Sequence, residues 1–497
     1  MSLMRKKSLD ILMHQADDSG KGLKRTLGAG NLIALGIGAI IGAGLFVRTA
    51  AAAGEHAGPA VTLSFIIAAV GCAFAGLCYA EFASMIPIAG SAYTYAYATM
   101  GELVAWVIGW ALILEYALGA ATVSIAWSEF LNNLVGGRIP YEWCHSPFES
   151  ALDANNVMHT GIMNIPALII LALLSLLLIK GTQESAIVNA IIVIIKVAIV
   201  LVFIVIGWQF INPDNHDPYF IPETAPPSIK PDGTEYSYKD FFRHGWGGVL
   251  TGAAIVFFAF IGFDAVSTAA QEAKNPKRDM PIGILGSLAI CTVLYILFSY
   301  VLTGVAPYTD FVKEGKEASV AYAIKNYMPG YEWLGTSVTV AILAGFSSVI
   351  LVMLMGQSRV FYTMANDGLL PKAFSDLHPR FRTPYKANII LFFFVGAFAA
   401  FVPVNVAGDL TSIGTLFAFV LVSAGVWIMR VNEPTRIRPF KTPLVPLVPI
   451  LGILICTAMI ISLPNATLLS ALAWMILGLL IYFIYSKNRS ALGKEGK

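Results

Sequence analysis

The chain has 497 residues, of which 57% are hydrophobic and only 12% are charged, and its formal net charge is +2. A typical soluble protein carries about 25% charged residues, so this composition excludes a water-soluble globular chain. The mean hydropathy of +0.73 agrees with that exclusion. The net charge of the whole chain is too small to indicate a class of binding partner, and no nucleic-acid partner is expected. The expected environment is the lipid bilayer.

Hydropathy predicts an all-α integral membrane protein with about twelve spanning helices of the ~20-residue length that a bilayer requires. In chain order the expected spans are Asn31–Ala53, Gly58–Ile86, Leu103–Leu131, Ile162–Ile179, Ile187–Trp208, Gly247–Ala270, Ile282–Val305, Trp333–Met364, Ala387–Val402, Leu410–Met429, Leu447–Leu463 and Leu468–Ile484. No signal peptide is expected before the first span, because residues 1–30 are polar and basic.

Basic residues collect on one side of this arrangement. With the N-terminus in the cytoplasm, about 23 of the 32 Lys and Arg residues face the cytoplasm. This bias predicts a multi-pass protein of the plasma (inner) membrane with both termini in the cytoplasm. Residues 1–30 and 487–497 would then be cytoplasmic tails, and residues 209–246 an extracellular loop.

One lysine lies in the middle of the fifth expected span. Lys196 is flanked by Ile, Val, Leu and Ala, and a lysine at the centre of a span costs about 2.5–3.5 kcal/mol on the insertion scale. It is too far from either end to reach the lipid headgroups. Its ammonium therefore faces protein or trapped water, held by carbonyls, hydroxyls or an acid. Such a residue marks a functional site by default, and the alternative is a lysine that pins two helices and never titrates.

Glycines crowd the middle of the first span, in the run Gly36–Phe46. A dinucleotide-binding loop is excluded, because the spacing is wrong and no strand precedes the run. One interpretation is close helix packing through small residues. The other is a discontinuous helix, unwound at Gly42, Ala43 and Gly44, whose freed N–H groups and positive dipole end would make an anion site.

The sixth span carries a matching feature. The run Phe257–Asp264 contains a mid-membrane glycine, Gly262, closely followed by an acid. Asp264 would either cap the second half-helix or titrate. Paired breaks in corresponding halves of a chain are the best sequence pointer to a transporter site at the bilayer midplane, where irregular backbone lines a cavity.

Five sequence segments together resemble one family. They are Leu35–Phe46, Phe258–Asp264, Glu272–Arg278, Met364–Pro371 and Ser412–Leu416. In this order and topology they resemble the amino acid–polyamine–organocation (APC) superfamily of secondary transporters, and within it bacterial relatives of the cationic amino acid transporter (CAT) family. The resemblance covers nearly the whole chain and implies the five-plus-five inverted-repeat, LeuT-like fold with broken helices 1 and 6. The repeats would be residues 31–208 and 247–429, with two further spans in residues 430–486.

The resemblance implies an amino acid bound by its backbone groups between the two breaks. The N–H groups near Ala43 and Gly44 would take the carboxylate. The carbonyls of Ile40, Phe258 and Ile261 would take the α-amine, which agrees with the polarity of helix ends. Phe258 would also lie over the site as an aromatic gate, unless it only packs against other helices. The other residues expected in the substrate site are Ile41, Gly42, Gly262 and Glu115.

Sodium-coupled relatives hold an ion between the first and eighth helices. The matching positions here are the carbonyls of Gly38 and Ile41 and the hydroxyls of Ser347 and Ser348. In proton-coupled members a lysine on the fifth helix points its ammonium into that position, and Lys196 fits. Burial disfavours the charged form of an amine, so Lys196 could release its proton during transport. Permanent replacement of sodium would instead give a sodium-independent exchanger or facilitator.

Glu115, in the third span, is the other buried charge. Cationic relatives carry an acid on this helix near the substrate, so Glu115 would attract a basic side chain or form part of the proton path. Glu81, in the second span, lies nearer the cytoplasmic end and is expected to be structural. With only one candidate acid beside an apolar pocket, small or neutral amino acids are favoured at least as much as arginine or lysine.

The expected function is secondary active transport of L-amino acids by alternating access, proton-coupled and sodium-independent. The alternatives are a sodium-independent exchanger or facilitator of cationic amino acids, and an amino acid sensor that does not transport. A channel, a primary pump and an enzyme are disfavoured, because the sequence has no repeated filter, no phosphate-binding loop and no catalytic cluster. No metal or cofactor is expected besides the coupling proton. Cys144 lies in an outer loop where some relatives join a single-pass subunit through a disulfide; nothing in the sequence indicates that partner, so a free thiol is expected.

Overall fold

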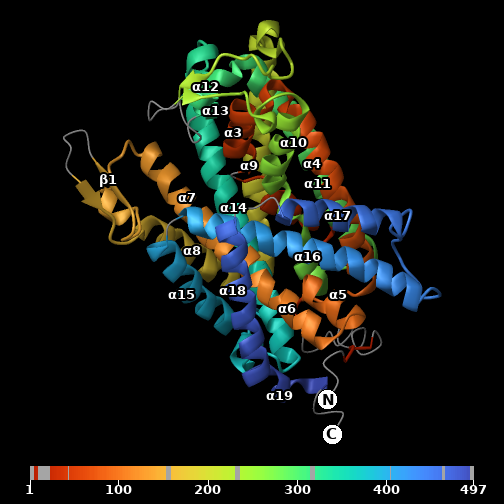
Figure 1. Cartoon of the computed structure of the whole chain (residues 1–497). Helices are drawn as coiled ribbons and strands as arrows, with labels where there is room; N and C mark the ends of the chain where they lie inside the picture. The colour runs from red at the N-terminus through yellow and green to blue at the C-terminus, as the bar shows by residue number, and fades with distance from the viewer. Residues whose placement is uncertain are drawn as a thin grey trace.

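The computed structural model describes residues 5–8, 23–42, 44–152, 158–229, 235–313, 319–402, 404–461 and 465–492. The described chain is predominantly helical (Figure 1). The first half contains α2 (Ala29–Ile40), η1 (Gly44–Arg48), α3 (Thr49–Ala52), η2 (Ala53–Ala57), η3 (Gly58–Ala60), α4 (Val61–Met85), α5 (Ser91–Thr99), α6 (Glu102–Ile113), η4 (Leu114–Leu118), α7 (Gly119–Leu134), η5 (Tyr141–Trp143), α8 (Ile165–Lys180), α9 (Thr182–Gly207), η6 (Trp208–Phe210), η7 (Pro213–His216) and η8 (Phe241–Arg243). The second half contains α10 (Gly245–Phe257), η9 (Phe258–Phe260), η10 (Phe263–Glu272), α11 (Pro276–Val305), α12 (Tyr308–Lys313), α13 (Ser319–Tyr327), α14 (Glu332–Asn366), η11 (Lys372–Ser375), α15 (Tyr385–Phe401), α16 (Val404–Asn432), α17 (Leu447–Ile461), α18 (Asn465–Ile481), η12 (Tyr482–Ser486) and α19 (Lys487–Arg489).

Two short hairpins lie in the loops between helices. β1 (Ser150–Leu152) pairs antiparallel with β2 (Met158–Thr160), and β3 (Ser228–Ile229) pairs antiparallel with β4 (Glu235–Tyr236). Both lie outside the expected spans, where backbone groups are not required to bond within a helix. The bundle itself is all-α, as expected.

Each of the twelve expected spans is helical along most of its described length. Among the described residues, eight helices are long and apolar enough to cross a bilayer. Four further apolar helices are shorter: Ala29–Ile40, Ile165–Lys180, Tyr385–Phe401 and Leu447–Ile461. The all-α membrane architecture is confirmed, while the number of twelve spans stays a prediction.

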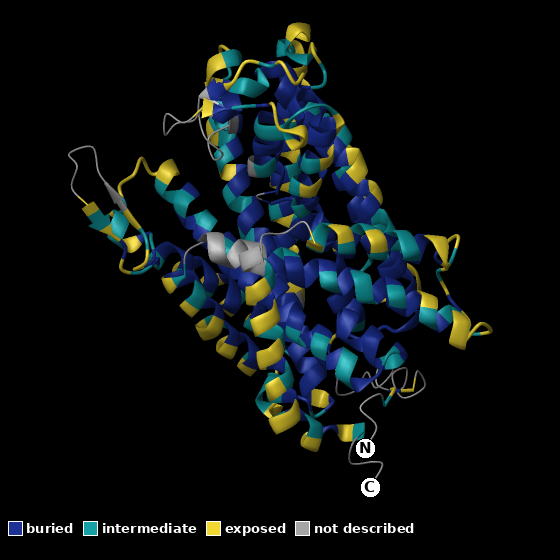
Figure 2. Ribbon diagram, in the orientation of Figure 1, coloured by how far each residue is buried: buried dark blue, intermediate teal, exposed yellow. Residues whose placement is uncertain are grey.

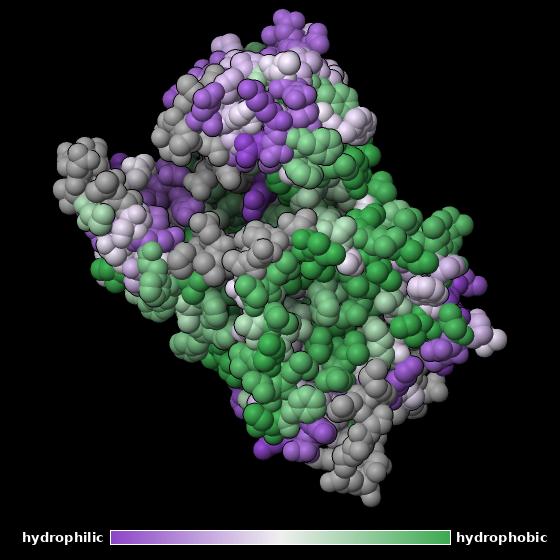
Figure 3. Space-filling model, viewed as in Figure 1, coloured by the Kyte–Doolittle hydropathy of each residue, from purple (hydrophilic) through white to green (hydrophobic). Residues whose placement is uncertain are grey.

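The outer surface of the bundle is apolar along its middle. Large hydrophobic side chains are exposed on α8, α9, α15 and α18, among them Leu176, Ile194, Phe393 and Leu480. Figure 3 shows that this apolar surface covers the middle and lower part of the molecule, whereas the upper end is polar. Figure 2 shows that the interior of the bundle is buried throughout. A lipid-facing belt around a packed interior is the pattern of an integral membrane protein.

Both ends of the described chain meet at one end of the bundle (Figure 1). Lys7 forms a buried ion pair with Asp367 at the end of α14. The backbone N–H of Ala491 donates to the Asp367 carbonyl at 2.9 Å, and Arg5 donates to the Leu492 carbonyl at 3.1 Å. We call these five residues the terminal clasp.

A second buried pair ties the start of α2 to the end of η10. Arg359 of α14 is fully buried, and its Nη2 donates to Glu272 Oε1 at 2.8 Å. The Glu272 carbonyl accepts the N–H groups of Thr26 and Leu27. Arg359 thus neutralises a buried acid inside the protein, where an unpaired charge would be costly.

Candidate functional site

The first span is interrupted near its middle. Helix α2 ends at Ile40, and Ile41 is extended, with φ −77° and ψ 98°. The chain becomes helical again in η1, which begins at Gly44. The break therefore starts earlier than the expected Gly42–Gly44, because Ile41 has already left the helix. Ala43, expected to bind the carboxylate, lies outside the described residues.

The second interruption lies in the sixth span. The helical turn η9 ends at Phe260, Ile261 is extended, and Gly262 has a φ of +113° that disfavours a side chain. Helix η10 begins at Phe263. Asp264 lies in the first turn of η10, whose preceding residue, Gly262, provides no side-chain cap. Of the two interpretations of Asp264, the cap is therefore wrong.

The two breaks pack against each other through residues with small side chains or none. A Cβ on Gly44 would lie 2.3 Å from the Cα of Ala259, and a Cβ on Gly262 would lie 2.9 Å from that of Ala39. The clash at Gly44 is with a backbone atom, so no side-chain rotation could relieve it. Small residues at both positions let the interrupted helices approach closely.

Tyr295 of α11 joins the carbonyl ends of both interrupted helices. Its hydroxyl lies 2.9 Å from the carbonyl oxygen of Ile40 and 2.9 Å from that of Ala259. Tyr295 is fully buried. The Ile40 carbonyl, expected to hold the substrate's α-amine, is thus already hydrogen-bonded to the protein, although a carbonyl oxygen can accept a second donor.

Lys196 of α9 reaches the end of α2. Its Nζ donates to the carbonyl of Gly38 at 2.9 Å and to that of Ile41 at 2.8 Å, and the residue is fully buried. Gly38 lies in the last turn of α2 and Ile41 directly follows the helix, at the end where a helix leaves its C=O groups without partners. A cation is favoured at that end by the helix dipole.

The two serines of the expected ion position behave differently. Ser347 donates to the Leu343 carbonyl in its own helix at 2.9 Å. Ser348 donates to Asn189 Oδ1 at 2.6 Å, and the Asn189 amide donates to the Ala34 carbonyl at 3.0 Å. Only Ser348 therefore links α14 to α9 and α2. Asn189 lies two turns before Lys196 on α9, and its sequence context alone did not point to this role.

A pocket lies where the two breaks meet. It contains about 430 Å³ of empty space, part of which is open to solvent. Its lining residues are Ala39, Ile40, Gly42, Gly44, Gly119, Thr122, Val123, Phe258, Ile261, Val349, Met353 and Thr411. Five expected residues are among them, whereas Ile41, Gly262 and Glu115 do not line it. The contributions of α7, α14 and α16 were missed, because their small and apolar residues carry no chemical signal.

Phe258 has a charged neighbour on the side of η1. The guanidinium of Arg48 lies 5.3 Å from the centroid of the Phe258 ring, a distance at which a cation is attracted to an aromatic face. Because Phe258 also lines the pocket, this pair covers one wall of it. The sequence indicated the ring but not the arginine.

Two buried acids lie at the second break without a basic partner among the described residues. Glu115 of η4 and Asp264 of η10 are fully buried and lie next to each other. Asp264 Oδ2 accepts the Tyr116 hydroxyl at 2.7 Å, but its other oxygen and both oxygens of Glu115 lack a hydrogen-bond donor. No ion pair reaches either acid within the part of the chain that the structure describes.

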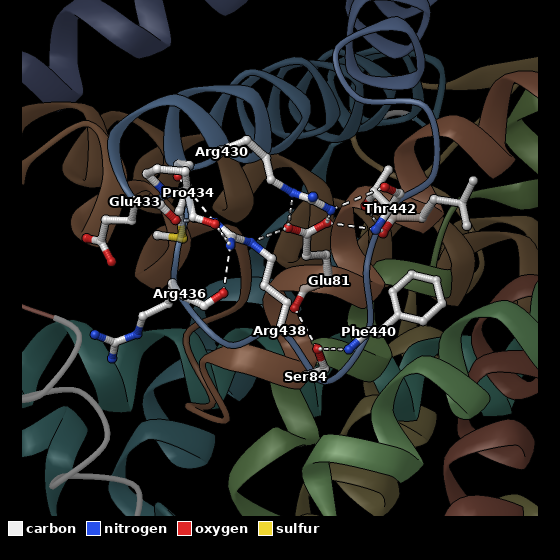
Figure 4. Close-up of polar contacts among 11 residues, drawn as sticks. Glu81, Ser84, Arg430, Glu433, Pro434, Arg436, Arg438, Phe440 and Thr442 are labelled. Carbon is white, nitrogen blue, oxygen red and sulfur yellow. Dashed lines mark hydrogen bonds and ion pairs between the residues drawn. The ribbon is translucent and has the colours of Figure 1, made fainter.

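Glu81 provides the contrast (Figure 4). Its carboxylate accepts from Arg430 Nε at 2.9 Å, from Arg438 Nε at 3.1 Å and from the Thr442 backbone N–H at 2.7 Å. This carboxylate is saturated by permanent charges on α16 and the loop after it, as a structural ion pair should be. Glu115 has no such basic partner among the described residues.

Among the described residues, no group of three or more His, Cys, Asp and Glu side chains is placed to hold a metal ion, and Cys144 is buried and free.

Comparison with known proteins gives matches along almost the entire chain. A family model described as amino acid permease matches residues 27–486. The branched-chain amino acid permease BcaP of Bacillus subtilis (strain 168) is 42% identical over 494 residues, which cover 99% of each chain. The methylthioribose transporter of the same organism is 39% identical over 99% of this chain and 100% of its own. The vacuolar cationic amino acid transporter 4 of Arabidopsis thaliana is 34% identical over 87% of this chain and 68% of its own.

The architecture and these matches agree with each other and with the resemblance found in the sequence. Interrupted helices that meet at a pocket inside an apolar bundle suit a carrier, and the matching proteins are carriers. The chain therefore belongs to the amino acid permease family of the APC superfamily, and it is a membrane transporter of amino acids, not an enzyme.

Proposed function

We propose that this protein takes up L-amino acids with small to medium neutral side chains by alternating access, driven by an inward proton gradient and without sodium. The observation that carries the substrate class is the pocket. Apart from backbone groups, its polar lining is limited to the hydroxyls of Thr122 and Thr411, and Val123, Val349 and Met353 provide apolar surface. Among the described residues, no charged side chain lines the pocket to pair with a basic substrate. The name of BcaP, a permease of branched-chain amino acids, agrees with this class.

The proposed coupling depends on Lys196. Its ammonium lies between the Gly38 and Ile41 carbonyls, in the place where the resemblance puts sodium. A lysine there already supplies the positive charge that a sodium ion would bring. In its charged form Lys196 would hold α2 closed against α9, and in its neutral form it would release that helix end.

Uptake by purified protein in sealed liposomes tests this function. Labelled leucine, alanine, arginine, lysine and methylthioribose are compared with an inward pH gradient, without one, and with a protonophore. We expect neutral amino acids to accumulate only with the gradient, equally in sodium and in choline buffer. Accumulation that follows sodium, or uptake of equal size with and without the gradient, would contradict the proposed coupling.

The same panel separates the alternatives. Exclusive uptake of arginine and lysine would favour a cationic amino acid exchanger and would make Glu115 the partner of the substrate side chain. Methylthioribose is included because a relative carries that name. Binding without flux of any compound would indicate a sensor. We place the protein in the plasma membrane with both termini in the cytoplasm, and cysteine labelling from either side of intact cells tests that orientation.

A further inference from the structure

We propose that the loop between α16 and α17, residues 433–446, binds the inner surface of the membrane, with apolar side chains among the lipid chains and cations on anionic lipid headgroups. We call this segment the interfacial loop. Its role is separate from substrate choice and proton coupling, and only the name of the leaflet depends on the proposed orientation.

The interfacial loop is fixed from inside by one carboxylate (Figure 4). Glu81, near the end of α4, accepts hydrogen bonds from Arg430 of α16 and from Arg438. It also accepts the backbone N–H of Thr442. Arg438 Nη2 donates to the Glu433 carbonyl at 2.7 Å, so the first part of the loop closes on itself. Both parts of the loop are thereby tied to α4.

Prolines stiffen the same segment. They are Pro434, Pro439, Pro443 and Pro446. A proline has a nearly fixed φ and no N–H group, so the loop has few backbone conformations and is unsuited to a helix or a strand. Its outward-facing side chains therefore keep one arrangement.

Two large apolar side chains lie on the outside of this stiff segment. Ile437 is 88% exposed although the next residue, Arg438, is buried, so the backbone turns the arginine inward and the isoleucine outward. Leu444 is 72% exposed and has a φ of +46°, in the left-handed region that leucine rarely adopts. The chain thus holds two branched aliphatic residues away from its core, where their burial would have stabilised the fold.

The apolar exposure continues into both flanking helices. Trp427 and Val431 are exposed in the last two turns of α16, and Leu447 and Leu454 are exposed on α17. Tryptophan is enriched where a helix leaves the bilayer. Figure 1 shows the loop projecting from the side of the bundle, and Figure 3 shows apolar and polar residues side by side at that edge. The loop therefore emerges at headgroup depth and extends the lipid-facing belt.

The leaflet follows from the neighbours of the loop. The backbone N–H of Phe440 donates to the Ser84 hydroxyl at 3.3 Å, near the end of α4. The next helix, α5, accepts the Lys7 N–H at its Tyr97 carbonyl. The loop therefore lies at the end of the bundle that holds both termini, which we place in the cytoplasm.

Cations lie beside the apolar residues. Lys441 is exposed, and Figure 4 shows the half-buried Arg436 pointing away from the Glu81 carboxylate. Apolar side chains next to Lys and Arg are the pattern of a segment that binds an anionic membrane surface. An acidic soluble protein would match the cations but leave Ile437 and Leu444 in water, and a second copy docked through the same loop would bring like charges together. An anionic lipid surface suits both features.

A fluorescent probe on Ile437→Cys tests the position of the loop in liposomes. The five native cysteines are buried, so a nitrobenzoxadiazole label attaches at the new site. We expect brominated lipid chains to quench this probe and iodide, present on both sides of the membrane, to leave it bright. A matched probe on Lys239→Cys, at an exposed residue of the loop before α10, should give the reverse. Leu444→Ser should make the first probe more accessible to iodide.

Two outcomes would overturn the insertion. Iodide quenching of the probe at position 437 as strong as that at position 239 would place the loop in water. A probe shielded from both quenchers would indicate that a protein, either a second copy or another partner, covers the loop. None of these readouts requires transport, so they stand even where the proposed substrate or coupling fails.

The same probe tests the headgroup contacts. Liposomes contain equal amounts of phosphatidylglycerol and phosphatidylcholine, and only one of the two lipids is brominated. A cation near an anionic surface favours anionic lipid by about fivefold, so we expect brominated phosphatidylglycerol to bind beside the probe about fivefold or more in preference. The double substitution Arg436→Gln, Lys441→Gln should lower this ratio toward one. Equal quenching by both lipids with the two cations in place would overturn the headgroup contacts.

Discussion

The two interrupted helices are held in opposite ways. At the first break, a cation holds the carbonyl end of α2: Lys196 donates to the carbonyls of Gly38 and Ile41. At the second break, acids with missing contacts lie at the start of η10, where Asp264 has one oxygen without a donor and Glu115 has two. The free carbonyls at the first break have a cationic partner, whereas the second break has buried carboxyl oxygens without a donor.

The difference follows from the polarity of helix ends. Free carbonyls at the end of a helix attract a cation, and free N–H groups at the start of a helix attract an anion. A lysine at the first position and a carboxyl at the second each suit their place. The second break therefore keeps polar atoms without partners, whereas the first does not leave its helix-end carbonyls unpaired.

The largest effect is expected where the breaks touch. Gly44→Val puts side-chain atoms onto the backbone of Ala259, which a Cβ would already approach to 2.3 Å. The two helices must separate, so we expect substrate binding to be lost in protein that still folds. Binding of labelled leucine to the purified variant measures this. Gly28→Val, at a glycine with open space around its Cβ position, is the control, and wild-type affinity in Gly44→Val would show that the pocket lies elsewhere.

A smaller loss is expected when the base at the first break is removed. Lys196→Met keeps most of the side-chain length but leaves two buried carbonyls without donors, at a cost of about 1–3 kcal/mol for each. Exchange and net uptake should both fall at least about tenfold, with weak substrate binding retained. Lys196→Arg, which restores a cation, should recover part of the exchange. If Lys196→Met keeps the wild-type dependence of uptake on pH, the lysine is a structural pin and not the coupling group.

Removing one shared hydroxyl should affect both breaks together. Tyr295→Phe deletes the donor common to Ile40 and Ala259, and a typical hydrogen bond contributes about 0.5–1.5 kcal/mol. We expect substrate affinity to fall several-fold, because the carbonyl ends lose their common support. Tyr300→Phe on the same helix is the matched control, and competition binding measures both. An equal affinity for Tyr295→Phe and wild type would mean that the breaks are positioned independently.

The smallest effect distinguishes two neighbouring serines. Ser348→Ala breaks the bond to Asn189 between helices and should lower stability by about 1 kcal/mol. Ser347→Ala removes only a bond within α14 and should change stability by less than about 0.5 kcal/mol. Thermal unfolding of the two purified variants makes this comparison. A larger loss of stability for Ser347→Ala than for Ser348→Ala would support the expected role of the Ser347 hydroxyl at the ion position.

The fold was largely predictable from the sequence, because its signals are local. An apolar run of spanning length or a mid-span glycine is visible without knowing its neighbours, and Gly262 was found in this way. The exact start of the first break was not, because Ile41 gives no sign of leaving the helix. The start of this break depends on Lys196, which is distant in the sequence and donates a hydrogen bond to the Ile41 carbonyl.

The site was predictable only in part, for the same reason. Lys196, Glu115 and Asp264 stood out because an ionisable residue in a span is costly. Their partners did not, because spacing within one span carries no information about which other span lies opposite. Tyr295 looks like any aromatic residue in an apolar helix, yet it bonds to both breaks. Only the packing of α11 against α2 and α4 reveals it.

The terminal clasp has a practical consequence for anyone who labels this protein. Its members from the two ends of the chain, Arg5 and Lys7 with Ala491 and Leu492, are held around Asp367 at the foot of α14. A fluorescent protein fused directly to either of these short segments competes with the contacts that hold the foot of that helix. Dyes attached through flexible linkers beyond each segment avoid this competition. Energy transfer between such a pair of dyes would act as a molecular ruler, and it would register every cycle in which the clasp opens.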